Sequence, residues 1–190
     1  VGSEMCIRDR IGTLVKDHDP VQKVTLVPRG QAQGLTWFSP DEEQTLVTRA
    51  QLKARIMGAL GGRAAEDVVF GHQEVTTGAG GDIQQVASMA RNMVTRLGMS
   101  DLGPVALEGG SQEVFLGRDL MSRSDVSESI SQQIDVQVRN MVKRCYDETV
   151  EIVAANREAI DRLVELLIEK ETMDGCLLYT SPSPRDFVRS

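Results

Sequence analysis

The strongest structural signal in this chain is a stripe of apolar residues that follows a glycine-rich loop. The stripe recurs every three or four positions and consists of Ile83, Val86, Met89, Ala90, Met93, Val94 and Leu97. This spacing places the apolar side chains on one face of an α-helix, and Gly98 is a typical C-terminal stop. Such a face has to be buried against other elements, so the stripe predicts a packed domain with a substantial helical part.

A second helix is predicted upstream of this loop. Thr48 and Gln51 form a capping-box pattern, which predicts a helix running to about Phe70. The helix is rich in small residues, which let a neighbouring backbone approach closely. These residues are Gly58, Gly61, Gly62 and Ala65.

The C-terminal third predicts two more helices. One is long, and its apolar face consists of Ile130, Ile134, Val138, Met141, Cys145, Thr149 and Ile152. Asn156 is predicted to cap the next helix, which continues to Ile168, and we expect the two helices to be antiparallel. Residues 99–124 predict no regular element.

The sequence predicts two strands near the N-terminus. Residues 21–27 alternate polar and apolar side chains and end at Pro28, and residues 34–38 follow after a polar connection. The fold expected is therefore mainly α, with a small two-stranded β element near the N-terminus.

Composition excludes several classes of function. The net charge of -7 argues against a nucleic-acid partner, because such partners are held by clustered Lys and Arg. Cys145 is the one cysteine outside the chain ends, so no disulfide framework or cysteine-based zinc site is expected. No apolar run approaches the roughly 18 residues of a membrane-spanning helix, and the chain as written is expected to be soluble.

The two ends differ in composition from the rest. Residues 1–10 and 176–190 lack helical or strand periodicity and resemble translated sequencing-adapter tails. We interpret both as foreign, leaving a native domain of about residues 11–175. The alternative is two ordinary disordered termini.

One carboxylate, Asp82, is a candidate for chemistry. It follows the glycine-rich loop 76–81 and precedes the helical stripe, with Gln85 three residues later. It could simply cap the helix, or the loop could deliver it as a metal ligand. The chain has two histidines, His18 and His72, and no His-Glu-x-x-His sequence. His18, next to two aspartates, is expected to be a solvated turn residue.

Four ordered segments carry a family resemblance. They are 61–66 (GGRAAE), 76–82 (TTGAGGD), 90–95 (ARNMVT) and 114–117 (VFLG). Together they resemble the peptidase domain of FtsH, a family of membrane-anchored, ATP-dependent AAA+ zinc metalloproteases, and are similar to versions from oxygenic phototrophs. The resemblance implies a mainly helical metalloprotease domain and a zinc ion held by an HExxH helix, with an aspartate that falls on Asp82. Glu66 is the second choice for that ligand.

The same resemblance implies partners that this chain does not itself encode. The parent would be a homohexamer that degrades unfolded membrane and soluble proteins, using ATP and Mg²⁺ in a separate ATPase module. It would reach the membrane through anchor segments absent here. The protease domain would face the cytoplasm or stroma, at a plasma or thylakoid membrane.

The chain departs from the family pattern at the metal. The HExxH motif should end just before Gly12, where residues 4–8 read EMCIR. Without two imidazoles Asp82 cannot hold Zn²⁺ strongly, and without Zn²⁺ no water is activated for attack on a peptide carbonyl. We therefore expect a fragment of an active protease that is itself inactive. The alternative is a non-catalytic pseudo-protease or a helical oligomerisation module.

A substrate contact is also implied by the resemblance, at Gly34, Leu35 and Thr36. An exposed strand edge there could hold an extended peptide by strand addition. An ordinary hairpin strand that buries Trp37 is an equally good interpretation of the same residues.

Overall fold

The computed structural model describes residues 15, 18, 21–25, 35–38, 46–107 and 127–174. In chain order the elements are β1 (Val21–Thr25), β2 (Leu35–Phe38), α2 (Arg49–Phe70), the 3₁₀ helix η1 (His72–Glu74), α3 (Gly80–Thr95), α4 (Glu128–Ala155), α5 (Arg157–Lys170) and β3 (Thr172–Asp174). The prediction of a mainly helical domain is confirmed. The predicted tails, Gly34 and the 114–117 segment lie outside the described residues.

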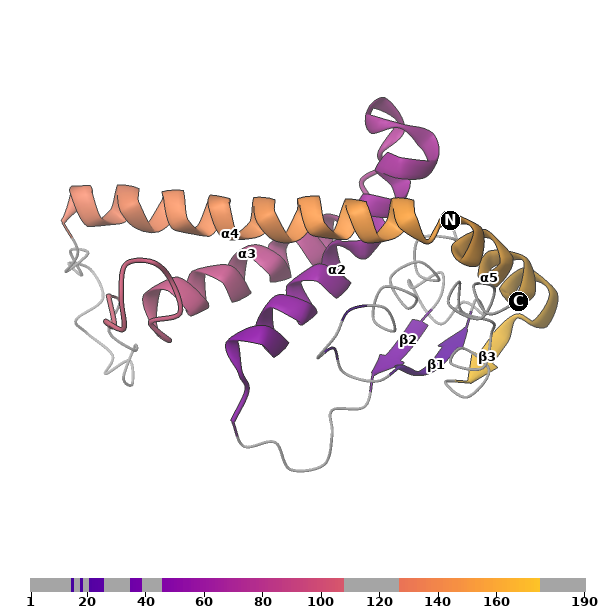
Figure 1. Cartoon of the computed structure of the whole chain (residues 1–190), viewed down its shortest axis with the longest axis horizontal. Coiled ribbons are helices and arrows are strands. Elements are labelled where there is room, and N and C mark those ends of the chain that lie inside the picture. The colour runs from indigo at the N-terminus through magenta and orange to yellow at the C-terminus, as the bar shows by residue number, and fades with distance from the viewer. Residues whose placement is uncertain are drawn as a thin grey trace, which may run out of the picture.

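Three helices form the main core. Figure 1 shows α4 as the longest element, with α2 crossing it and α3 beside it. The buried cluster between them includes Ile56, Leu60, Val86, Ala90, Met93, Val94, Ile134, Met141 and Cys145. Each large apolar side chain buried in this way contributes about 1.5–3 kcal/mol. The predicted stripe of α3 is thus the buried face, although Ile83 and Leu97 at its ends are exposed.

The start of α2 follows its predicted capping box. The Gln51 backbone N–H donates to Thr48 Oγ1 at 3.2 Å, and the Thr48 N–H donates to Gln51 Oε1 at 2.8 Å. The helix ends at Phe70, as predicted, and Gly71 follows with φ +89°, a conformation that other residues rarely adopt.

The group that packs closely against Gly58 is a side chain, whereas the sequence predicted the close approach of a neighbouring backbone. A Cβ at Gly58 would overlap His18 Nε2 and lie 2.9 Å from His18 Cδ2. The prediction of a solvated turn histidine is wrong, because His18 is half-buried with its imidazole against α2. The glycine makes room for a segment 40 residues earlier in the chain, which a local sequence pattern does not reveal.

The last two helices are not the antiparallel pair expected. Asn156 alone separates α4 from α5, and Figure 1 shows α5 turning from the end of α4 toward the sheet. Asn156 also does not cap α5 with its side chain; its Nδ2 donates back to the Ile152 carbonyl of α4 at 2.8 Å. The physical reason is that α5 buries Leu163 and Leu167 against the sheet.

The sheet has one strand more than predicted. The strand order is β2-β1-β3, with both pairs antiparallel, so the predicted two-stranded element is confirmed and β3 joins its other edge. Val24 of β1 lies opposite Met173 of β3, and both are buried against α5. The hydroxyls of Thr25 and Thr172 lie 2.8 Å apart and tie the two strands together. No helix in the described part of the chain is long and apolar enough to span a bilayer.

Candidate functional site

Asp82 lies inside the first turn of α3. The helix begins at Gly80 with Ala79 at the N-cap, so Asp82 is the third helical residue and does not cap the helix. A carboxylate in this turn is stabilised by the positive end of the helix dipole. The side chain is half-buried.

Neither steric crowding nor an unusual backbone angle requires glycine at positions 80 and 81, directly before Asp82. A Cβ at Gly80 or Gly81 would meet no atom within 4 Å, and neither residue has a positive φ. The loop from Thr76 to Gly78 is exposed. Within the described part of the chain, the face of α3 at Gly80 and Gly81 is therefore open, although Ala79 just before it is buried.

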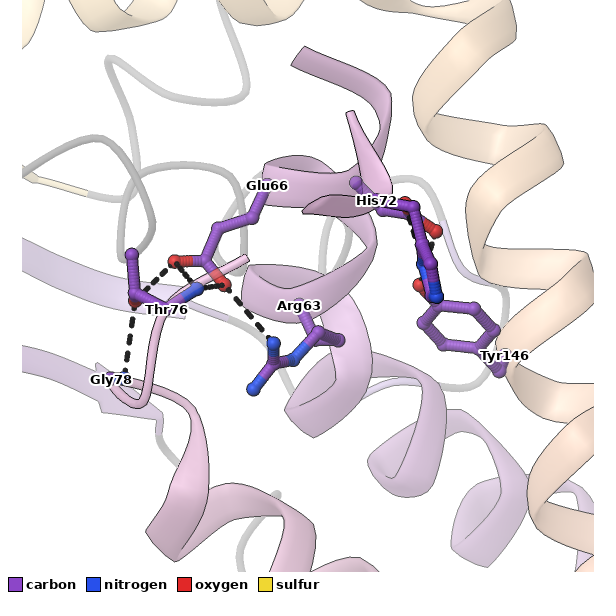
Figure 2. A network of polar contacts seen from close by, with 7 residues as sticks. Arg63, Glu66, His72, Thr76, Gly78 and Tyr146 are labelled. Atoms are coloured by element: carbon purple, nitrogen blue, oxygen red, sulfur yellow. Dashed lines mark hydrogen bonds and ion pairs between the residues drawn. The ribbon is translucent and has the colours of Figure 1, made fainter. Parts of the chain in front are cut away.

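Glu66 has a different environment. Its side chain is 1% exposed, and both carboxylate oxygens lie 3.3 Å from the Thr76 backbone N–H, which donates to them. The Thr76 hydroxyl donates to Oε1 at 2.5 Å, and the Arg63 guanidinium lies 3.8 Å from Oε2. Figure 2 shows these contacts joining the end of α2 to the loop before α3.

The contacts of Glu66 extend one step further toward Asp82. Thr76 Oγ1 accepts a hydrogen bond from the Gly78 N–H at 3.2 Å, just before α3 begins. Glu66 therefore positions the loop that carries Asp82. From the sequence, Glu66 is predicted only as a metal ligand. The one signal for its positioning role is Thr76, ten residues later, whose hydroxyl donates to the buried carboxylate.

A second polar contact ties the end of α2 to α4. The Tyr146 hydroxyl donates to Asp67 Oδ2 at 2.7 Å, and His72 Nδ1 lies 3.2 Å from Asp67 Oδ1 (Figure 2). Burial, together with the hydrogen bond and the negative charge of Asp67, raises the pKa of Tyr146 to about 12. The phenol therefore stays protonated and donates at any physiological pH. The His72 side chain is 88% exposed, although it lies beside Asp67.

The described residues do not fit a zinc ion by themselves. Within residues 15, 18, 21–25, 35–38, 46–107 and 127–174, no three His, Cys, Asp or Glu side chains are grouped so that they could hold a metal. Catalytic zinc needs three protein ligands. Residues 4–8, where the family pattern would place the paired histidines, lie outside the described residues.

Two of the three predicted substrate residues are placed. Leu35 and Thr36 are the first residues of β2, opposite Thr25 and Val24 of β1. Since β2 is an outer strand of the described sheet, one of its edges has no partner strand within that sheet. This is the arrangement that strand addition requires.

Comparison with known proteins identifies the family. Residues 10–178 match the model of peptidase family M41. The ATP-dependent zinc metalloprotease FtsH of Trieres chinensis is 55% identical over 165 residues, which are 86% of this chain and 26% of that protein. FtsH of Cyanidium caldarium is 53% identical over 163 residues, covering 86% of this chain and 26% of that protein.

A plant relative gives the same result. The chloroplastic ATP-dependent zinc metalloprotease FTSH 2 of Oryza sativa subsp. japonica is 49% identical over 176 residues, which are 92% of this chain and 25% of that protein. The chain thus spans about a quarter of the length of these curated relatives. Because the family model covers most of the chain, this protein belongs to peptidase family M41 and corresponds to the peptidase domain of FtsH.

Proposed function

We propose that this chain is the peptidase part of an ATP-dependent zinc metalloendopeptidase that degrades unfolded membrane and soluble proteins. The match over residues 10–178 and the names of the relatives support this proposal. ATP and Mg²⁺ would act in the rest of a longer parent, which would assemble as a homohexamer. The parent would be membrane-anchored, with this domain on the stromal side of a thylakoid membrane or on the cytoplasmic side of a plasma membrane. One relative is chloroplastic, which supports an organelle parent.

Asp82 is proposed as the third zinc ligand of that parent. The observation that carries this assignment is the contrast between the two candidate carboxylates. Glu66 is buried and already accepts hydrogen bonds from Thr76, whereas Asp82 lies half-buried at the open start of α3. If Glu66 bound a metal, the Thr76 N–H and hydroxyl would lose their acceptor. Losing hydrogen bonds to a buried carboxylate is costly.

The chain as written is proposed to be inactive. Its 190 residues contain no His-Glu-x-x-His, and both histidines have other neighbours: His18 packs on Gly58, and His72 lies beside Asp67. Asp82 alone supplies one ligand, so no metal-dependent step is assigned to this chain. The residues that it does contribute position the start of α3 and, by proposal, hold an extended substrate along the free edge of β2.

A direct test compares two proteins on an unstructured, fluorogenic peptide. One is the chain as written, and the other carries a helix with His-Glu-x-x-His directly before Gly12. We expect no cleavage by the first and chelator-sensitive cleavage by the second. Glu→Gln within the added motif should abolish the activity, which controls for contaminating proteases.

Two results would contradict the proposal. Cleavage by the chain as written would show that the missing motif is not needed. If the motif-bearing chain folded and bound zinc but cleaved nothing, the alternative of a non-catalytic module would be favoured instead.

A further inference from the structure

A small hollow of about 20 Å³, open to solvent, lies between the start of α2, the turn after α3 and the middle of α4. Met141 and Cys145 of α4 line it, and both are buried. Arg49 of α2 lies 17 residues before Glu66, a separation of about 25 Å along a helix. The hollow is therefore at the opposite end of α2 from the Glu66 contacts.

Three cations line this hollow: Arg49 and Lys53 of α2, and Arg144 of α4. We call the hollow that they line the cationic hollow. No ion pair joins any of the three to a carboxylate within the described part of the chain. This is unusual in a protein with a net charge of -7, in which acidic partners outnumber basic ones.

Two carboxylates, Asp101 and Glu148, belong to the same lining. With three cations they leave a formal charge of +1, and neither forms an ion pair with the cations. Burial, followed by the charge of Glu148, raises the pKa of the Cys145 thiol, so the floor of the hollow stays neutral. The lining as a whole therefore has cationic donors that are not neutralised by direct contact.

The positions of Arg49 and Lys53 on α2 add to this excess of positive charge. Arg49 is the first helical residue, Lys53 lies one turn later, and the first turn has no acidic residue. The N-terminus is the positive end of a helix dipole, where cations are unfavourable and anions are stabilised. An anion bound beside Arg49 and Lys53 would offset both the side-chain charges and the dipole.

We propose that the cationic hollow binds a phosphate group. Guanidinium groups donate in a planar fork that matches two phosphate oxygens, and an ammonium adds a point charge. Asn140 and Gln137 supply neutral amide donors from the same lining. The phosphate could be free inorganic phosphate or a phosphorylated side chain of another protein, because both present the same dianionic oxygens.

The test is a calorimetric titration of the whole 190-residue chain at constant ionic strength. One arm uses inorganic phosphate, and the other uses a short phosphoserine peptide, with its unphosphorylated form as control. We expect saturable binding of at least one phosphate ligand, and the tighter ligand identifies the source. Arg144→Gln and Lys53→Gln should each weaken it by about tenfold or more, since a hydrogen bond to a charged group contributes that much.

Lys143→Gln is the matched control. It removes the same charge one residue along α4, at a lysine that pairs with Asp147 at 2.6 Å and does not line the hollow. It should leave binding unchanged. The proposal is overturned if neither phosphate ligand saturates, or if Lys143→Gln weakens binding as much as Arg144→Gln and Lys53→Gln do. Circular dichroism on each variant establishes that it is folded before its affinity is interpreted.

Discussion

Gly58→Ala should destabilise this protein, although the same change inside most helices stabilises them. Alanine is favoured over glycine in a helix interior by about 1 kcal/mol. At Gly58 the new Cβ would overlap His18 Nε2 and lie 2.9 Å from Cδ2 and 3.3 Å from Cε1. Such overpacking costs about 1–3 kcal/mol. The net effect in the natural sequence is a loss of about 0–2 kcal/mol.

The sign should reverse when the imidazole is removed. In a His18→Ala background the three atoms nearest to the new Cβ are gone, so Gly58→Ala should stabilise by about 1 kcal/mol. The coupling between the two positions is then about 1–3 kcal/mol, in the range seen for residues in contact. Urea unfolding of the four proteins, followed by circular dichroism, measures all of these terms.

Gly81→Ala serves as the control. A Cβ there meets no atom within 4 Å, so its effect should be the same with and without His18. If Gly58→Ala stabilises the protein equally in both backgrounds, His18 does not pack against α2 and the reasoning fails.

Three further predictions concern the polar contacts and the metal. Glu66→Ala should lower the free energy of unfolding by about 1.5–3 kcal/mol, because it removes the buried carboxylate that accepts hydrogen bonds from the Thr76 N–H and hydroxyl, whereas Asp82→Ala should cost less than about 1 kcal/mol in urea melts. Stability should fall as the pH rises from about 10, where an unfolded tyrosine ionises, to about 12, the raised pKa of Tyr146, and Tyr146→Phe should flatten this dependence; an unchanged slope would argue against the Asp67 contact. Elemental analysis of the purified chain after dialysis against a chelator should find no stoichiometric zinc, and one retained equivalent would contradict the proposed inactivity.

The helices could be predicted from the sequence because their signals are local. The stripe of α3 repeats within 16 residues, and the capping box of α2 needs only Thr48 and Gln51. The sequence correctly placed Asp82 at the start of α3. The helix begins at Gly80, however, whereas the sequence predicted that it would begin after Asp82. Helix ends depend on caps, and Ala79 provides no side-chain signal for one.

The features that were missed depend on contacts between distant parts of the chain. β3 is three residues long and exists because it pairs with β1, nearly 150 residues earlier. The burial of His18 requires Gly58, and the direction of α5 follows from Val24 and Met173, which it covers. None of these partners is visible in a local pattern. The role of Glu66 was missed for a related reason, since its partner Thr76 lies across a turn.

The role of Asp82 is tested by the zinc affinity of the chain with a His-Glu-x-x-His helix added before Gly12, compared between Asp82→Ala and Glu66→Gln. Losing an outer partner of a zinc ligand costs roughly ten- to hundredfold in affinity, so losing a ligand should cost at least as much. We predict such a loss for Asp82→Ala and little change for Glu66→Gln. Unchanged affinity in Asp82→Ala, or a loss confined to Glu66→Gln, would contradict the assignment of Asp82 as the third ligand.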